Sequence, residues 1–121
     1  MGKVIIADDE EHILSVMVDV LTDAGHDVKG VPDGPSMLAE LKLNNYDVAL
    51  IDVMMPKMNG YQVAAQIHGL PEPPRIVIVT SRSYDGDRSV VSNVGVDAFL
   101  PKPFANQDLV KVVANLLAKG S

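Results

Sequence analysis

The feature that most constrains the fold of this chain is a fivefold alternation between two hydrophobic periods. Short, mostly apolar runs are each followed by a segment in which apolar residues recur every three or four positions. The runs span residues 3–7, 26–31, 48–52, 75–80 and 97–100. Short runs of this kind indicate buried strands, whereas the longer spacing indicates one apolar face of a helix. Alternating strands and helices with short connections predict a parallel sheet covered by helices.

The expected fold class is therefore α/β, a doubly wound five-stranded parallel sheet with helices on both faces. The runs 3–7, 48–52 and 75–80 are almost purely aliphatic, which is typical of central strands. We expect the flavodoxin-like strand order 2-1-3-4-5, which is taken from known folds of this type and not from the residues themselves. With 121 residues, the chain has the usual size of one domain, so we expect a single domain over 1–121.

Polar residues and glycines mark where the helices begin and end. We expect Asp9 to cap a first helix that starts at Glu10 and stops at Gly25. Asp33 is expected to cap the second helix and Asn59 the third. A fourth helix is expected to carry Val90, Val91 and Val94, and a fifth to carry its apolar face from Leu109 to Leu117.

Composition excludes several function classes. The net charge of −6 argues against direct binding of nucleic acid or of an anionic membrane. The chain has no cysteine, so it has neither a disulfide framework nor a cysteine metal site. It shows no signal peptide, and no apolar run approaches the roughly 18 residues of a membrane span. We therefore expect a soluble, cytoplasmic domain.

The third apolar run ends on a single carboxylate, Asp52, within the stretch YDVALIDVMMPKMNG at residues 46–60. The chain then breaks into a turn at Pro56, which closes with Asn59 and Gly60. A carboxylate at the carboxyl end of a buried parallel strand lies where open sheets bind their ligands. We interpret Asp52 as a nucleophile that becomes phosphorylated.

Four other reactive side chains also follow strand ends: Asp8 and Asp9 after the first run, Thr80 in the fourth, and Lys102 after the fifth. Because these ends share one edge of a parallel sheet, we expect all of them to converge with Asp52. Three close carboxylates repel one another unless a cation lies among them, and oxygen ligands favour Mg²⁺ or Mn²⁺. Lys102 and the metal can neutralise a phosphoryl group, and Thr80 can donate a hydrogen bond to it.

With these residues in place, the chain closely resembles the receiver domain of two-component response regulators, with a fold like that of the chemotaxis regulators. The resemblance covers essentially the whole length. It rests on Asp8-Asp9, on Asp52 followed by MMPxMNG, on Thr80 and on Lys102-Pro103-Phe104. Each motif is weak alone, and their order at the ends of the predicted strands makes the resemblance specific.

The resemblance implies a metal site and a phosphoryl donor. Mg²⁺ is expected to bind Asp8, Asp9, Asp52 and the backbone carbonyl of Met54. Asp52 is expected to accept a phosphoryl group from a histidine of a sensor kinase or of a histidine phosphotransfer protein. The chain is then a signalling domain, not an enzyme, and its chemistry is limited to its own phosphorylation and slow dephosphorylation.

The resemblance also implies a switch. Thr80 and Lys102 are expected to contact the phosphoryl oxygens, and Phe99 occupies the position of the family's aromatic switch residue. The Lys102–Pro103 bond is expected to be cis. Phosphorylation is expected to change the face made by helix 4, strand 5 and helix 5. That face would signal to a downstream protein target or a fused output domain, or form a dimer on phosphorylation.

Each of these residues has an ordinary structural interpretation when it is taken alone. Asp8 and Asp9 suit a helix start, Asp52 a turn, Thr80 a strand end and Lys102 a solvated surface. It is their joint pattern that favours the phosphoacceptor interpretation.

One alternative is a phosphatase of the haloacid-dehalogenase type, which also uses an aspartyl nucleophile, Mg²⁺, Thr and Lys. Such enzymes place a second acid two residues after the nucleophile, where this chain has Met54. A phosphatase assay distinguishes the two.

A second alternative is a flavin- or nucleotide-binding module on the same fold. That module needs a Gly/Ser/Thr-rich phosphate loop after the first strand. Here the loop is ADDEE at residues 7–11, which would repel phosphate. An absorbance scan for flavin tests this alternative.

Overall fold

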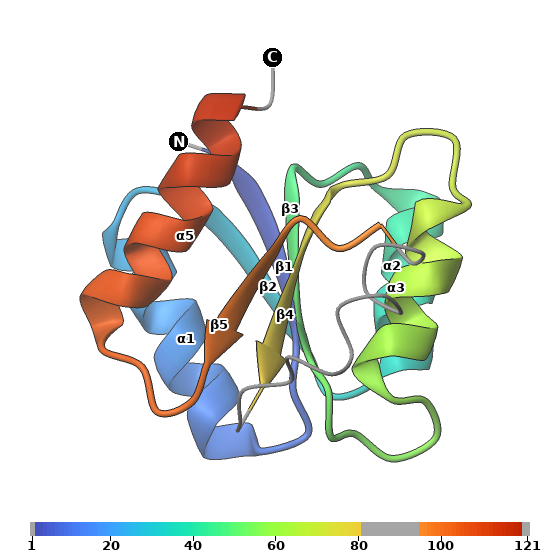
Figure 1. Cartoon of the computed structure of the whole chain (residues 1–121), viewed down its shortest axis with the longest axis horizontal. Helices are drawn as coiled ribbons and strands as arrows, with labels where there is room; N and C mark the ends of the chain where they lie inside the picture. The colour runs from blue at the N-terminus through green and yellow to red at the C-terminus, as the bar shows by residue number, and fades with distance from the viewer. Residues whose placement is uncertain (1, 81–94, 120–121) are drawn as a thin grey trace.

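In the computed structural model, five parallel strands form one sheet in the order β2-β1-β3-β4-β5 (Figure 1). Helices lie on both faces of this sheet, which confirms the predicted fold class and strand order. The strands are β1 (Lys3–Ala7), β2 (Asp27–Val31), β3 (Val48–Asp52), β4 (Arg75–Thr80) and β5 (Ala98–Pro101). The helices are α1 (Glu11–Asp23), α2 (Gly34–Leu43), α3 (Gly60–His68) and α5 (Asn106–Lys119).

The structure describes residues 2–80 and 95–119. The predicted helix that carries Val90, Val91 and Val94 lies outside these residues. Among the helices within them, none is long and apolar enough to cross a membrane.

Two apolar clusters lie on opposite faces of the sheet, because successive strand residues point to opposite sides. On β3, Ala49 and Ile51 join the cluster covered by α2 and α3. Val48 and Leu50 join the cluster covered by α1 and α5. All four side chains are fully buried, and each large aliphatic side chain buried in this way contributes about 1.5–3 kcal/mol. The central strands are therefore held from both sides, which makes their carboxyl ends a rigid platform.

Side-chain caps fix the starts of α2 and α3 in the structure. Asp33 Oδ1 accepts a hydrogen bond from Ser36 N at 2.8 Å. Asn59 and Gln62 form a reciprocal capping box, with hydrogen bonds of 3.0 and 2.9 Å. Both predicted caps are confirmed, and each satisfies backbone N–H groups that have no partner within the helix.

The prediction that Asp9 caps the first helix was wrong. Helix α1 starts at Glu11, and Glu10 takes the N-cap position in an extended conformation without a side-chain cap. The cause lies one residue before Asp9, because Asp8 Oδ1 accepts a hydrogen bond from Glu10 N at 2.8 Å. That bond closes a side-chain turn over Asp9, so the helix begins only after Glu10, and the exposed Asp9 stays at the edge of the sheet.

Strand β5 starts at Ala98, one residue later than the sequence predicts. The backbone N–H of Asp97 donates to Ile76 O at 2.8 Å, and its side-chain Oδ2 accepts from Ile76 N at 2.7 Å. The carboxylate of Asp97 thus takes the position that a strand carbonyl would otherwise fill. An aspartate that pairs through its side chain closes the ladder at the amino edge of the sheet.

Candidate functional site

The register of the two central strands brings two carboxylates together. Ala7 of β1 pairs with Ile51 of β3, so Asp8 and Asp52 each lie one residue beyond the same pair. Both residues are buried, with only 1% and 5% of their surfaces exposed. Because parallel strands end at one edge, the two acids occupy the carboxyl edge at the middle of the sheet.

A third carboxylate completes an acid cluster, which we define as Asp8, Asp9 and Asp52. Each residue offers a carboxylate oxygen within 4.8 Å of the other two. Asp8 Oδ2 is buried and accepts no hydrogen bond from the described residues, although burying such an atom without a hydrogen bond costs free energy. Oxygen donors of this kind suit a hard divalent cation such as Mg²⁺, which would take up that oxygen. The cluster therefore fits the predicted metal site.

The fourth predicted metal ligand, Met54, lies directly beside the cluster. Its backbone N–H donates to Asp52 Oδ1 at 3.1 Å, which fixes the start of the loop after β3. Its side chain is 68% exposed. The Met54 backbone is thus close to the Asp52 carboxylate, and its apolar side chain lies at the rim of the site.

Lys102 supplies a cation to the cluster from the segment that follows β5. Its Nζ lies 3.1 Å from Asp52 Oδ2 and 3.8 Å from Asp8 Oδ2. The Lys102–Pro103 peptide bond is cis, as predicted. One ammonium group thus lies between the acid that follows β1 and the acid that ends β3, which joins three separate segments of the chain in one site.

Burial and charge shift the ionisation of two of these groups. Burial raises the pKa of the Asp8 carboxyl from 3.8 to about 6, an effect that the Glu10 amide partly offsets and the charge of Asp52 reinforces. Burial alone would lower the pKa of Lys102. The hydrogen bond to Asp52 and the charges of Asp52 and Asp8 outweigh it, so the pKa of Lys102 is raised. The lysine therefore stays charged, and Asp8 is held in its ionised form at a cost in free energy.

Thr80 ends β4 at the same edge and is buried. Asp52 pairs with Val79, so Thr80 lies one residue beyond that pair. The carbonyl oxygen of Thr80 accepts a hydrogen bond from Lys102 N. The structure thus places all the residues predicted for the site at one edge of the sheet, and their chemical roles stay predictions.

Sequence reasoning missed two features of the loop 53–59 that follows Asp52. Lys57 has a positive φ of 71° and its Nζ lies 3.3 Å from Asp33 Oδ2, which ties the loop to the cap of α2. Gly60, the first residue of α3, lies against the Asp52 backbone. In the sequence, the Asn59-Gly60 pair indicates only a turn and a helix start. The contact between Gly60 and Asp52 could not be read from it, because that contact depends on how α3 packs against β3.

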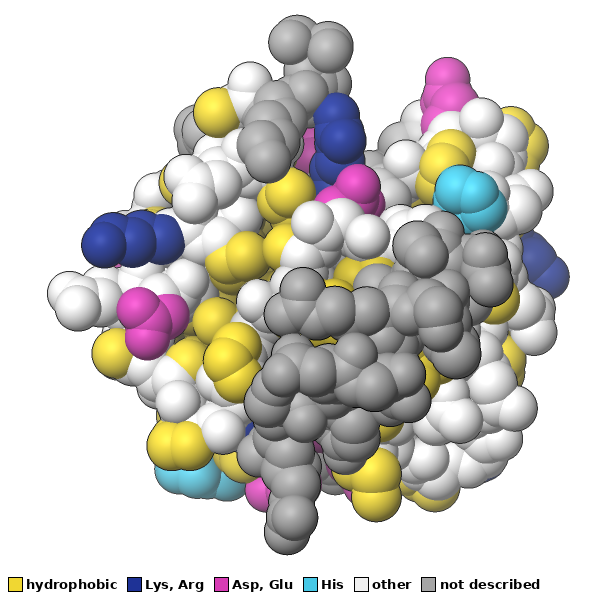
Figure 2. Space-filling view, in the orientation of Figure 1, with side chains coloured by type: hydrophobic (Ala, Val, Ile, Leu, Met, Phe, Trp, Pro, Cys, Tyr) yellow, Lys and Arg dark blue, Asp and Glu magenta, His cyan; other side chains and the backbone are white. Residues whose placement is uncertain are grey.

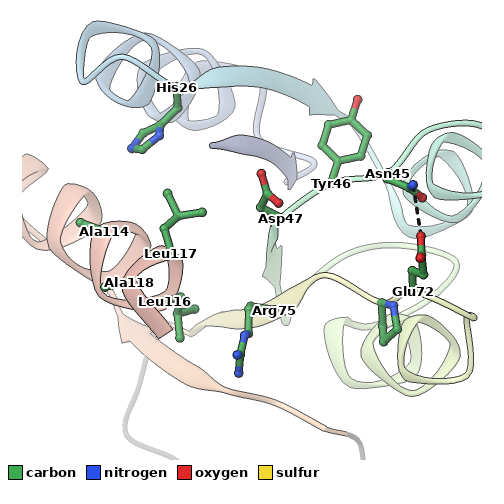
Figure 3. Close-up of a pocket in the computed structure, with 11 residues that line it drawn as sticks. His26, Asn45, Tyr46, Asp47, Glu72, Arg75, Ala114, Leu116, Leu117 and Ala118 are labelled. Atoms are coloured by element: carbon green, nitrogen blue, oxygen red, sulfur yellow. Dashed lines mark hydrogen bonds between the residues drawn. The ribbon is translucent and has the colours of Figure 1, made fainter. Parts of the chain in front are cut away.

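A hollow of about 920 Å³ lies at the opposite, amino edge of the sheet (Figure 3). Asp47 and Arg75 lie on its strand side, and Leu117 and Ala118 of α5 lie across from them. Asn45 and Glu72 are joined by a hydrogen bond of 3.3 Å at one side. None of the predicted site residues lines this hollow, so the acid cluster and the hollow are separate features of the two edges.

Comparison with known sequences agrees with the geometry. The family model of the response regulator receiver domain matches residues 4–114. The chain is similar to the sensory transduction protein RegX3 of Mycolicibacterium smegmatis, with 31% identity over 121 residues, which are 100% of this chain and 53% of the relative. It is also similar to the transcriptional regulatory protein CpxR of Klebsiella pneumoniae, with 32% identity over 119 residues, 98% of this chain and 50% of the relative. The chain spans about half the length of these relatives.

Comparison with solved structures gives the same result. The receiver domain of the Francisella response regulator 1452 superposes with a TM-score of 0.91 at 27% identity, over 100% of both chains. The chemotaxis protein CheY4 of Vibrio cholerae superposes with a TM-score of 0.92 at 28% identity, over 96% of this chain and 98% of that one. Both similarities cover at least 96% of this chain.

Proposed function

Because the chain belongs to the response regulator receiver domain family, we propose that it accepts a phosphoryl group on Asp52. The donor is a histidine of a sensor kinase or of a histidine phosphotransfer protein. The observation that carries this proposal is the Asp52 carboxylate, which is buried, 3.1 Å from Lys102 Nζ, and inside an acid cluster. A carboxylate ion pair of purely structural use would not need two more carboxylates beside it.

The transfer is a displacement at phosphorus. One carboxylate oxygen of Asp52 forms a bond to the phosphorus while the bond from phosphorus to the donor imidazole breaks, and the imidazole leaves with that electron pair. Phosphoryl transfer depends mainly on in-line positioning and on offsetting charge. Lys102 already lies 3.1 Å from Asp52 Oδ2, where its ammonium group offsets negative charge on the incoming phosphoryl oxygens. The hydroxyl of Thr80 donates a hydrogen bond to one of these oxygens.

Asp8, Asp9, Asp52 and the Met54 carbonyl would hold Mg²⁺ or Mn²⁺. A bound divalent ion supplies positive charge that lowers the repulsion between the carboxylates and the phosphoryl oxygens. Asp8 prepares the site for such an ion, because its Oδ2 is buried and accepts no hydrogen bond from the described residues. The hydrogen bond from Glu10 N fixes Asp8 Oδ1 in place.

The phosphorylated state signals through the face made by β5, α5 and the helix 4 region, which lies outside the described residues. Phe99 of β5 is half-buried and packs against the cluster on the α2 and α3 side of the sheet. Figure 2 shows hydrophobic side chains gathered between α5 and the centre of the view, where β5 runs in Figure 1. Movement of Thr80 toward the phosphoryl group gives Phe99 space to rotate inward, which changes this face for a protein target, a fused output domain or a second copy.

Intact-mass analysis after incubation with acetyl phosphate and Mg²⁺ tests the phosphoacceptor. The wild type is expected to gain one phosphoryl group, and Asp52→Asn is expected to gain none. Asp47→Asn is the matched control, because Asp47 precedes the same strand at its other end, and it is expected to behave like the wild type. A wild-type protein that stays unmodified, or that carries the group on another residue, contradicts the assignment.

A further inference from the structure

Helix α3 begins in direct contact with the peptide of the proposed phosphoacceptor. A Cβ atom built on Gly60 would lie 2.7 Å from the carbonyl oxygen of Asp52 and 3.0 Å from the Cα of Val53. The N–H of Gly60 donates to Val53 O at 3.0 Å. The loop 53–59 therefore leaves β3 after Asp52 and turns back, so that Gly60 contacts the backbone of Asp52 and Val53.

The atoms that such a Cβ would meet are backbone atoms, which cannot rotate away as a side chain does. The backbone of β3 is held in the sheet on this side as well, because Val53 N donates to Val79 O at 3.1 Å. A methyl group at residue 60 must therefore displace either the start of α3 or the Asp52 peptide. The Asp52 carboxylate would move with its peptide, and its contacts with Lys102 Nζ and Met54 N are both 3.1 Å long.

We propose that Gly60 is a positioning residue for phosphoryl transfer, an inference that rests on the proposed function of Asp52. The missing side chain lets α3 close onto the Asp52 peptide and sets the height of its carboxylate between Lys102 and Asp8. Gly60 touches neither donor nor phosphoryl group and acts only through Asp52. Misplacing reacting atoms by about 1 Å costs up to about 10²-fold in rate, so one methyl group here has a chemical consequence.

The chain offers a matched control in Gly34, which is the first residue of α2 as Gly60 is of α3. A Cβ atom on Gly34 would lie 2.5 Å from Val63 Cγ2 and 3.3 Å from Met58 Cβ. These are side-chain atoms of α3 and of the loop before it, and neither belongs to the acid cluster. Gly34→Ala therefore introduces a methyl group at the equivalent position of α2, where it clashes with side chains and does not touch the Asp52 peptide.

The test measures the rate of phosphorylation against acetyl phosphate concentration in Mg²⁺ for the wild type, Gly60→Ala and Gly34→Ala. The temperature is one at which circular dichroism shows all three folded. Gly60→Ala is expected to lower the maximal rate about tenfold or more, and Gly34→Ala is expected to change it less than about twofold. Equal effects of the two variants overturn the positioning role. An unphosphorylated wild type overturns the proposed function itself, so the two failures are distinguishable.

Amide NMR spectra without metal or donor provide a readout that stability alone does not move. Gly60→Ala is expected to shift the Met54 amide, which donates to Asp52 Oδ1, and Gly34→Ala is expected to leave it in place. An unmoved Met54 amide in Gly60→Ala overturns the inference. If Gly60→Ala does not fold, Asn59→Ala replaces it, because it removes the capping box that holds the start of α3. It is then expected to slow phosphorylation a few-fold, and an unchanged rate overturns the proposal.

Discussion

Aspartate side chains at the two edges of the sheet have different kinds of partner. At the amino edge, Asp47 Oδ2 accepts from Lys3 N at 2.8 Å, and Asp97 Oδ2 accepts from Ile76 N at 2.7 Å. At the carboxyl edge, Asp8 and Asp52 face each other and Lys102.

The difference follows from the backbone. Parallel strands begin with N–H groups at one edge and end with carbonyl groups at the other. A carboxylate at the amino edge therefore finds a backbone donor in the neighbouring strand. A carboxylate at the carboxyl edge meets backbone carbonyl groups, so its partners have to be loop amides, a lysine or a metal. The residue type alone does not distinguish a structural aspartate from a reactive one, whereas the edge of the sheet on which it lies does.

The largest expected difference between the two edges is in Mg²⁺ affinity. Asp9→Ala combined with Asp52→Asn removes two of the three clustered carboxylates and is expected to weaken Mg²⁺ binding about a hundredfold, or roughly 2.8 kcal/mol. Asp47→Asn combined with Asp97→Asn carries the same loss of two charges at the amino edge. It is expected to change the affinity by less than about threefold, because screening weakens distant charges. Calorimetric Mg²⁺ titration measures both, and equal losses would break the comparison.

The next effect is on stability and depends on pH. The pKa of Asp8 is about 6 in the fold and 3.8 ordinarily, so between these two pH values the folded state holds a proton that the unfolded state has released. The proton uptake by Asp8 therefore favours the folded state near pH 4, and this contribution to stability is lost as pH rises through about 6. Asp8→Asn is therefore expected to raise the free energy of unfolding by about 1–2 kcal/mol near pH 7.5 in metal-free buffer.

The same substitution is expected to have little effect near pH 4, where Asp8 is already mostly protonated in the fold. Urea unfolding of wild type and variant at both pH values, with a chelator present, gives the difference directly. A variant that is less stable than the wild type near pH 7.5 contradicts the unfavourable burial of this carboxylate.

At the amino edge the sign is expected to reverse. Asp97→Ala removes the acceptor for Ile76 N and the ion-pair partner that lies 3.7 Å from Arg75 Nη1. The free energy of unfolding is expected to fall by about 1 kcal/mol, the usual net value of one such hydrogen bond. The phosphorylation rate of this variant serves as its control, since it should match the wild type. A variant that is more stable than the wild type would remove the distinction between the edges.

The smallest effect concerns the two most exposed large apolar side chains of the described residues, one toward each edge. Met54, at 68% exposure, lies beside Asp52, and Leu43, at 79%, ends α2 toward the amino edge. Met54 cannot accept a proton or orient a water for hydrolysis, so we expect a phosphorylated state that lasts minutes or more. Met54→Asn is expected to speed its decay a few-fold, well below the roughly 10²–10⁴-fold of a true general base. Leu43→Asn is expected to leave the decay unchanged.

Decay is followed by intact mass in Mg²⁺ buffer after removal of the donor. Arg82, the second residue predicted to affect hydrolysis, lies outside the described residues, and Arg82→Glu is measured beside Met54→Asn. A wild-type half-life of seconds, or no acceleration in either variant, means that another group sets the lifetime.

The parts of the fold that could be predicted are those set by periodicity. Alternation of strand and helix patterns placed Asp8 and Asp52 at one edge, because every parallel strand of such a sheet ends there. The predicted bounds of α3 and β4 agree with the structure for the same reason. These features depend on sequence neighbours, which the chain itself displays.

What could not be predicted depends on individual contacts that the hydrophobic pattern does not display. Asp9 suits a helix cap as well as a cation site, and the hydrogen bond between Asp8 and Glu10 N decides against the cap. The first residue of β5 depends on Asp97 pairing across to Ile76. The position of Gly60 against Asp52 depends on the packing of α3. In each case the local pattern allowed two geometries, and one specific contact selected between them.

The contact between Lys102 and Asp52 joins residues 50 positions apart, and this has a consequence for the protein during its synthesis. Asp8, Asp9 and Asp52 leave the ribosome well before the lysine that offsets their charge. A nascent chain that ends before residue 102 has the three carboxylates of the acid cluster without the Lys102 ammonium beside them, so we expect it to bind an anionic phosphoryl donor poorly. Only a chain that has been synthesised past Lys102, with β5 in place at the edge of the sheet, offers the full site. We therefore expect competence for phosphorylation to appear only after β5 and Lys102 have joined the sheet.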